Sequence, residues 1–313
     1  MPVNINTLKS KSSGFSWLNV ISAQKAEIDY LRKKFKFDSL DLKDSYAKNI
    51  AQRPKFYWRS NYCFLLLQFP VFNRQLRTID AEEVNFFVGQ NYLITAHRRV
   101  LPPLVEFFNL CESDKFYSEQ YLNGDNLTIL YEIIVRLQEY CYPIMDHVSL
   151  DVQNIEKNIF AGREREMVKE ILLIKRNILN FRKIMEAHKD VLQKLTKGNG
   201  KIISGEKMKV YYNDLIEHTK DIWDILNGQK EMIEALEDTN TSLISFKLSD
   251  IMRLLTIFSV TILPLSLLAG IFGMNITNAM PLVHHPLGFW VVIITLAIIA
   301  LSMFLVFKRK RWL

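Results

Sequence analysis

The sequence predicts an α/β N-terminal domain in the cytoplasm, followed by long helices that form a stalk and by two C-terminal transmembrane helices. Three observations support this fold class. Strand and helix signals alternate over the first hundred residues, only helix signals occur from about residue 115 onward, and residues 254–307 contain no Asp, Glu, Lys or Arg. Because soluble domains cover their surfaces with charge, the uncharged block excludes a purely cytosolic protein.

The α/β domain is assigned to residues 1–114. Its apolar patterns predict, in order, a short strand at 15–20, an amphipathic helix at 23–35, one or two aromatic-rich strands within 55–72, a hairpin formed by 83–88 and 91–96, and a helix beginning within 101–110. The hairpin turn is Gly89-Gln90-Asn91, and Pro102-Pro103 mark the start of the last helix.

The following regions are helical. Long helices are predicted at 121–142, 146–197 and 206–272, with breaks at Asn123-Gly124, Pro143 and Gly198-Asn199-Gly200. These stretches define cytoplasmic helices in 115–205 and a stalk helix in 206–253. At 1.5 Å per residue, one helix over 206–272 would be about 100 Å long and would reach from the membrane deep into the cytoplasm.

The uncharged block divides into two membrane spans, at residues 254–272 and 289–307, because roughly 20 helical residues cross a hydrocarbon core. The connector, 273–288, carries no charge. Arg253 precedes the first span, and the tail 308–313 carries Lys308, Arg309, Lys310 and Arg311. The positive-inside rule therefore predicts an outward-facing connector and cytoplasmic termini, and no apolar stretch near Met1 resembles a signal peptide.

Charge and cysteine content exclude other classes. Four of the seven net positive charges lie in the tail, which leaves too few elsewhere to indicate a nucleic-acid partner. Cys63, Cys111 and Cys141 are odd in number and widely spaced, so we expect reduced, mostly buried thiols. The sequence contains no P-loop or dinucleotide-binding motif, so a bound nucleotide is not predicted. Glu164, Glu166 and Glu170 alternate with basic residues, which is typical of a solvated helix face, so an enzyme is not predicted either.

The third long helix carries a heptad-spaced line of small, polar or flexible residues. Counting back from Gly270, this seam comprises Ser266, Leu263, Ser259, Thr256, Met252, Ser249, Ser245, Ser242 and Asp238, and it continues to Asp214. Hydroxyls within the membrane and carboxylates below it are typical of a cation-facing wall. The alternatives are interhelical packing, hydroxyls bonded to their own helix, and a merely solvated acidic stripe. A conducting path would need several copies around an axis.

A specific resemblance arises where the first span ends. Gly273-Met274-Asn275 and Met280-Pro281 stand between two C-terminal spans, and the chain ends in a basic run before Trp312-Leu313. The N-terminal half contributes Gln52-Arg53-Pro54-Lys55 and the run from Asn91 to Arg98. In these features the chain resembles the CorA family of divalent-cation channels.

The resemblance implies a funnel-shaped homopentamer in the inner (plasma) membrane, in contact with lipid, that transports Mg²⁺, with Co²⁺ or Ni²⁺ as further cargo. Gly273, Met274 and Asn275 would form the selectivity filter, since amide oxygens can bind the hydration shell that Mg²⁺ gives up reluctantly. The pore positions would be Ser249, Met252, Leu255, Thr256, Ser259, Leu263, Ser266 and Gly270. Two alternatives to the filter role are that Gly273 serves only as a helix C-cap and that Asn275-Ile276-Thr277 serves as a glycosylation sequon.

Regulation by intracellular Mg²⁺ is also implied. Asp214 and Asp238 match acidic family positions in the stalk and in a cytoplasmic sensor between subunits, where Asn73 replaces the expected carboxylate. We therefore expect weak Mg²⁺ binding there. Low Mg²⁺ would loosen the bundle and open the gate at Met252 and Leu255, and the membrane potential would drive entry.

Two other functions compete with this interpretation. Leu282 stands where the family often has an acid, and His284 and His285 lie nearby, which would suit Zn²⁺ in a ZntB-like, proton-coupled transporter or would simply be exposed side chains. A membrane-anchored scaffold is the more remote alternative, because an anchor needs neither an uncharged connector nor a hydroxyl seam.

Overall fold

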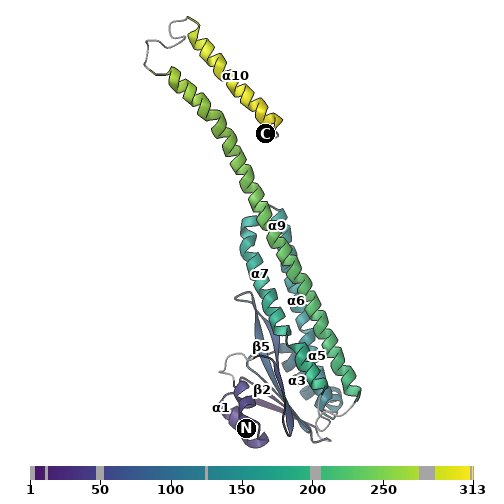
Figure 1. Ribbon diagram of the computed structural model, residues 1–313. Coiled ribbons are helices and arrows are strands. Elements are labelled where there is room, and N and C mark those ends of the chain that lie inside the picture. The colour runs from purple at the N-terminus through teal and green to yellow at the C-terminus, as the bar shows by residue number, and fades with distance from the viewer. Residues whose placement is uncertain are drawn as a thin grey trace. The chain divides into compact units, whose positions relative to one another are not determined.

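The computed structural model describes residues 4–10, 13–46, 53–123, 126–197, 206–274, 286–310 and 312. The chain divides into two compact units, Met1–Asp238 and Thr239–Leu313, and this division falls inside one long helix. The α/β unit, the long helix and the C-terminal helix confirm the predicted fold class (Figure 1). The finer domain divisions at residues 114 and 205 stay a prediction.

A six-stranded sheet forms the base of the first unit (Figure 1). Its strands are β1 (Ile5–Lys9), β2 (Ser16–Ile21), β3 (Lys55–Trp58), β4 (Tyr62–Asn73), β5 (Thr78–Gly89) and β6 (Tyr92–His97). Their order is β1-β2-β6-β5-β4-β3, and all neighbours are antiparallel except β2 and β6. The β5–β6 hairpin is confirmed, but β5 begins earlier than predicted, and β1 was not predicted at all.

Both faces of the sheet are buried, which explains the apolar run in β4. Cys63, Leu65 and Leu67 face the larger core, beneath the long helices, whereas Phe64 and Leu66 face a smaller core beneath the first two helices. A strand covered on both sides loses the alternation of apolar and polar residues that a half-exposed strand shows. The three cysteines are free and buried as predicted, and burial raises the pKa of the Cys63 and Cys111 thiols to about 12.

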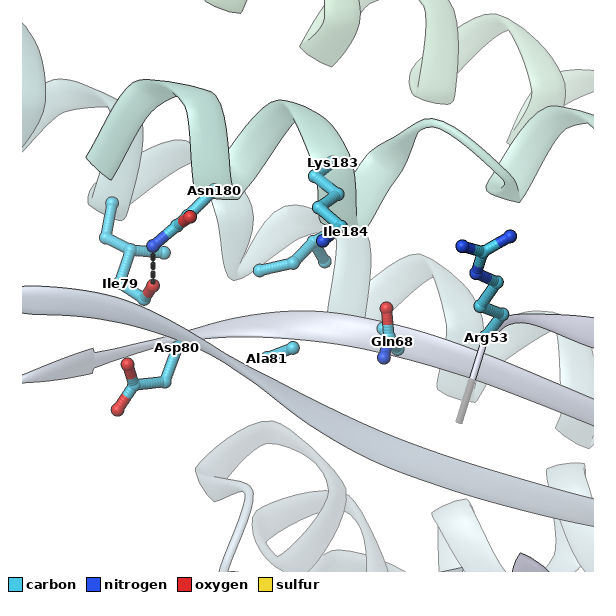
Figure 2. A pocket seen from close by; sticks show the side chains of 8 residues that line it. All are labelled: Arg53, Gln68, Ile79, Asp80, Ala81, Asn180, Lys183 and Ile184. Carbon is cyan, nitrogen blue, oxygen red and sulfur yellow. Dashed lines mark hydrogen bonds between the residues drawn. The ribbon is translucent and has the colours of Figure 1, made fainter. Parts of the chain in front are cut away.

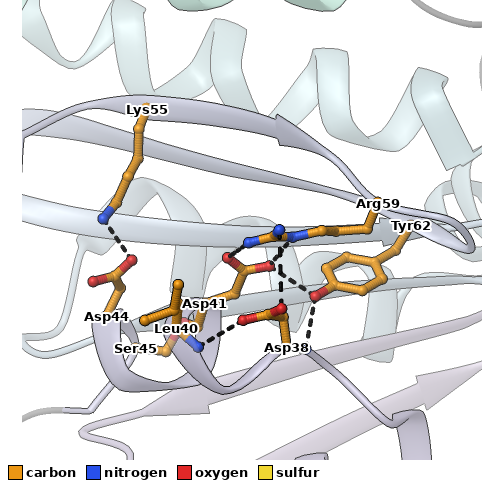
Figure 3. Close-up of polar contacts among 8 residues, drawn as sticks. All are labelled: Asp38, Leu40, Asp41, Asp44, Ser45, Lys55, Arg59 and Tyr62. Atoms are coloured by element: carbon orange, nitrogen blue, oxygen red, sulfur yellow. Dashed lines mark hydrogen bonds and ion pairs between the residues drawn. The ribbon is translucent and has the colours of Figure 1, made fainter.

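The smaller core is covered by α1 (Lys25–Phe35) and α2 (Ser39–Asp44). The second of these helices was not predicted, and a partly buried ion pair, in which only the Asp41 side chain is fully buried, fixes it to the sheet (Figure 3). Arg59 donates from Nε and Nη2 to the two Asp41 carboxylate oxygens at 2.9 and 2.6 Å, and the Tyr62 hydroxyl donates to Oδ2 of the same carboxylate at 2.7 Å. Six residues are too few to hold a helix by propensity alone, so these contacts stabilise it.

Helices cover the other face and extend away from it. They are α3 (Pro102–Ser113), α4 (Lys115–Tyr117), the π-helix η1 (Ser118–Leu122), α5 (Asn126–Glu139), α6 (Cys141–Phe160), α7 (Glu164–Met185), α8 (His188–Thr196) and α9 (Glu206–Phe272). Within the first unit, α9 lies along α5, α6 and α7 (Figure 1), and buried amides tie it to two of them. Gln138 donates to the Thr219 hydroxyl at 2.8 Å, and Gln229 donates to the Met145 carbonyl at 2.8 Å.

The prediction of one helix over 146–197 was wrong. The chain breaks at 161–163, where Gly162 takes a left-handed φ of 87°, and again at 186–187. The helix break predicted at Pro143 is also wrong, because α6 runs through this residue. It is the third residue of α6, where the missing N–H has no intrahelical partner to lose.

The glutamates of α7 form a solvated face only in part: Glu166 is exposed, as predicted, whereas the other two are engaged by the protein. Glu164 is buried, and Glu170 accepts two hydrogen bonds from Arg77 of the β4–β5 hairpin, at 3.1 and 2.8 Å. That guanidinium lowers the pKa of the Glu170 carboxyl. Asn177 of the same helix donates to the Arg77 carbonyl and accepts from the Ile79 N–H, so α7 is fixed to the start of β5.

The second unit contains the C-terminal part of α9 and α10 (Gly288–Arg309). Both α9 and α10 are long and apolar enough to cross a membrane. Large apolar side chains are exposed throughout this unit, among them Phe258 and Leu267 at 63% and 66%. Such exposure suits surroundings of lipid or other helices rather than water.

Candidate functional site

The predicted pore residues lie on the surface of α9. Met252, Leu255 and Leu263 are 55%, 58% and 68% exposed. The smaller members of the set, Ser249, Thr256, Ser259, Ser266 and Gly270, are exposed as well. Side chains on the other faces of this part of α9 are equally exposed. Exposure alone therefore does not show whether the seam contacts partner helices or lines an ion path.

Hydroxyl groups along the seam are partly engaged by their own helix. Thr256 Oγ1 donates to the Met252 carbonyl at 2.8 Å, and Ser245 Oγ donates to the Thr241 carbonyl at 2.9 Å. The back-bonded alternative therefore holds at these two positions. A hydroxyl that donates to its helix still has lone pairs to offer, so each presents an acceptor, which is the group that a hydrated cation requires.

Pro264 interrupts the backbone hydrogen bonds of α9 beside Leu263. Because proline has no N–H, the Val260 carbonyl one turn earlier loses its intrahelical donor. A carbonyl freed inside a membrane must find another partner, such as a neighbouring helix, a hydroxyl or water. This position thus adds a backbone acceptor close to the predicted constriction.

The described part of the predicted filter, Gly273 and Met274, directly follows α9. The Gly273 N–H donates to the Ala269 carbonyl at 2.9 Å, and the Met274 N–H donates to the Ile271 carbonyl at 3.3 Å. Gly273 directly follows the last residue of α9, so it occupies the C-cap position, but not in the left-handed conformation that most favours glycine there. A Cβ at Gly273 would lie 3.1 Å from the Ala269 oxygen, which explains why glycine suits this site. Asn275 lies outside the described residues, as do His284 and His285.

The basic tail begins within α10. Lys308 and Arg309 occupy its last turn, where positive charge complements the helix dipole, and Lys310 follows as the C-cap. Trp312 stacks on Phe307 with ring centroids 5.9 Å apart, and the Lys310 ammonium lies 5.9 Å from the Trp312 ring. Aromatic and basic residues together are typical of a membrane–water interface. Arg311 lies outside the described residues.

Asp214, the predicted sensor residue, has two polar neighbours. The Tyr131 hydroxyl of α5 donates to Asp214 Oδ2 at 2.8 Å, and His218 Nε2 lies 3.8 Å from Oδ1, one turn along α9. The Asp214 side chain is 45% exposed, so the carboxylate is anchored but accessible. Burial and this hydrogen bond raise the pKa of Tyr131, which keeps its hydroxyl a donor at neutral pH.

Asn73 has a structural task that the sequence did not reveal. It ends β4, and its Oδ1 accepts from the backbone N–H groups of Gln75 and Leu76 at 3.1 and 3.2 Å, which closes the hairpin turn. Asp238 is exposed on α9. Within one chain, no hydrogen bond or ion pair among the described residues joins Asn73, Asp214 and Asp238. The same residues contain no cluster of three or more His, Cys, Asp or Glu side chains that could hold a metal ion.

The neighbours of Asp214 were missed at the sequence level. His218 could have been found, because residues four apart on a helix share a face. Tyr131 could not, since it precedes Asp214 by 83 positions and no local pattern connects them.

Comparisons with known proteins agree along nearly the whole chain. The family model described as CorA-like Mg2+ transporter protein matches residues 12–309. The chain is 25% identical to the cobalt/magnesium transport protein CorA of Thermotoga maritima over 96% of this chain and 84% of the relative, and 22% identical to the protein of that name from Methanocaldococcus jannaschii over 95% and 91%. The complete structure of the CorA magnesium transporter from M. jannaschii superposes with a TM-score of 0.83 at 21% identity, covering 98% of this chain and 94% of that one. Fold, motif and match together place this chain in the CorA-like Mg2+ transporter family.

Proposed function

We propose that this chain is the subunit of a divalent-cation channel in the inner (plasma) membrane that takes up Mg²⁺, with Co²⁺ or Ni²⁺ as further cargo. The observation that carries the proposal is the family match over residues 12–309, which includes both apolar helices and the Gly-Met-Asn run between them. Relatives named as cobalt/magnesium transport proteins support the choice of ions. Orientation follows from the basic tail: both termini are cytoplasmic and residues 273–288 face outward.

Self-association into a homopentamer is part of the proposal. Apolar side chains remain exposed on α9 within the first unit, where lipid is not expected: Val210 at 69%, Tyr211 at 50%, Ile225 at 41% and Met232 at 50%. Tyr211, Ile225 and Met232 are spaced by multiples of seven, so they share one face of the helix. A helix that leaves such a face open in one copy is suited to contact another copy.

The conducting path would follow the seam of α9. Gly273, Met274 and Asn275 would bind the hydrated ion at the outer end, and Met252, Leu255 and Leu263 would form hydrophobic rings that close the pore by dewetting. The acceptors at Thr256 and at the Val260 carbonyl support this assignment, because both can bind the water of a hydrated cation.

Driving force and regulation need no further component. A membrane potential supplies about 4.6 kcal/mol for a divalent ion per 100 mV, so no nucleotide is required. Inhibition by internal Mg²⁺ would act at Asp214, whose carboxylate is half-exposed and held by Tyr131. Asn73 would contribute little, since its side-chain oxygen already closes a turn, and Asp238 would serve as a further stalk carboxylate.

Flux into proteoliposomes tests the function. With voltage as the only gradient, we expect Mg²⁺ uptake, and uptake lost in Asn275→Ala but retained in the matched control Asn278→Ala, which alters the same amide in the same connector. Zinc uptake that requires a pH gradient would instead favour the ZntB-like alternative. An assembled Asn275→Ala oligomer that still carries Mg²⁺ would disprove the filter, and absence of any ion flux would leave the scaffold.

A further inference from the structure

A cavity lies between the sheet and the last turns of α7, apart from all residues assigned to ion transport. Its volume is about 450 Å³, and its lining includes Gln68 of β4, Ala81 of β5, and Asn180 and Lys183 of α7. Arg53, which precedes β3, completes one side (Figure 2). This arginine belongs to the Gln-Arg-Pro-Lys run that the transport function leaves without a role.

The alternation of side chains along β5 creates the space. Ile79 and Ala81 point towards α7, and the single methyl of Ala81 leaves room that a larger side chain would fill (Figure 2). Asp80, between them, points to the opposite side of the strand, where its carboxylate lies 3.8 Å from the Arg99 guanidinium. The one acidic residue in the lining is thus directed away from the cavity.

The two cationic residues of the lining have no acidic partner in the described parts of the chain. No carboxylate lies within 4.0 Å of the Arg53 guanidinium or the Lys183 ammonium there, whereas Lys175, two turns earlier on α7, is paired with Glu237. Both side chains are exposed, so water solvates them while the cavity is empty, and an anion placed between them would be attracted by both charges.

We propose that this cavity binds the phosphate group of a small phosphorylated metabolite such as a nucleotide. An Arg guanidinium offers a planar fork of donors and a Lys ammonium offers a point charge, and together they match a phosphate with several oxygens. The cavity is larger than one phosphate and falls within the range of about 300–1,000 Å³ typical of small-molecule sites, so it has room for an attached organic group.

The walls of the site are held in place without the ligand. The Asn180 amide donates to the Ile79 carbonyl at 3.4 Å, and the buried His188 donates from Nε2 to the Gln68 carbonyl. Burial lowers the pKa of His188 to about 4, so the ring is neutral and adds no charge near the site. A cavity whose floor and wall are already fixed loses little entropy when it binds.

The test is calorimetric titration of the detergent-solubilised full-length protein with ATP, in buffer free of divalent cations so that chelation cannot contribute. Wild type should bind ATP saturably, and inorganic phosphate more weakly. Lys183→Gln and Arg53→Gln should each weaken ATP binding about tenfold or more, the usual effect of losing one charge-assisted contact. Ala81→Leu should block the site by volume alone, with all charges kept.

Lys189→Gln is the matched control, because it removes an exposed lysine that does not line the cavity. The proposal is overturned if neither ATP nor phosphate binds, if adenosine binds as tightly as ATP, or if Lys183→Gln and Arg53→Gln bind as wild type does. None of these outcomes depends on ion flux, so failure here and failure of the transport function are separate results.

Discussion

Neutralising Asp214 should weaken inhibition by internal Mg²⁺. Asp214→Asn keeps an oxygen that can accept the Tyr131 hydroxyl at 2.8 Å but removes the negative charge. Since the side chain is 45% exposed, the dielectric of water applies. Two unit charges 4 Å apart then interact by about 1 kcal/mol, so a divalent ion loses about 2 kcal/mol, or roughly 30-fold in affinity.

The assay is Mg²⁺ uptake by proteoliposomes loaded with increasing internal Mg²⁺, read as the concentration that halves the flux. Tyr131→Phe is the matched control: it removes the hydrogen bond and keeps the charge, so the midpoint should move far less. An unchanged midpoint in Asp214→Asn would refute the sensor role. An equal shift in both variants would show that the position of the carboxylate matters rather than its charge.

Three further predictions concern the glycine at the filter, a buried histidine and the ion pair of α2. Gly273→Ala should lower Mg²⁺ flux, because the new Cβ would lie 3.1 Å from the Ala269 carbonyl oxygen. Gly228→Ala is the control: its Cβ would meet nothing within 4 Å, so it should conduct normally and raise the free energy of unfolding by about 0.5–1 kcal/mol. Equal fluxes in the two variants would contradict this prediction. The pKa of His188 is about 4 in the folded protein and 6.5 in the unfolded chain, so the unfolded chain binds a proton first as the pH falls. About 3 kcal/mol of the free energy of unfolding should therefore be lost between pH 6.5 and about 4. Thermal unfolding should show this loss in wild type and not in His188→Gln. Arg59→Ala strands the fully buried Asp41 carboxylate and should cost about 3 kcal/mol or more in the same assay, and a change below about 1 kcal/mol would mean that Tyr62 suffices.

The membrane helices and the hairpin were predictable because each rests on a strong local signal. A charge-free block has no soluble explanation, and Gly89-Gln90-Asn91 separates two apolar runs. The missed elements lack such signals. The strand β1 is five residues long and mostly polar, and α2 depends on Arg59, which lies 18 positions after Asp41. Tertiary contacts decide these elements, and local sequence does not contain them.

The candidate site divides in the same way. Heptad counting predicts which residues of α9 share a face, since a helix turns a fixed spacing into a shared face, and that seam stays a prediction because the other faces are exposed too. It could not show that Thr256 donates to its own helix or that Asn73 closes a turn. Both are choices among hydrogen-bond partners, which the spacing of residues leaves open.

The boundary between the two units lies within α9, between Asp238 and Thr239, and not in a flexible linker. Within the second unit, the remainder of α9 sets the facing of each residue by its position along the helix. One residue inserted between Met252 and Ser266 would turn the residues that follow by about 100° about the helix axis, whereas seven would restore the original facing to within about 20°. Met252, Ser259 and Ser266 stand seven residues apart and share a face only while that spacing is kept, so the length of this segment matters as much as its composition.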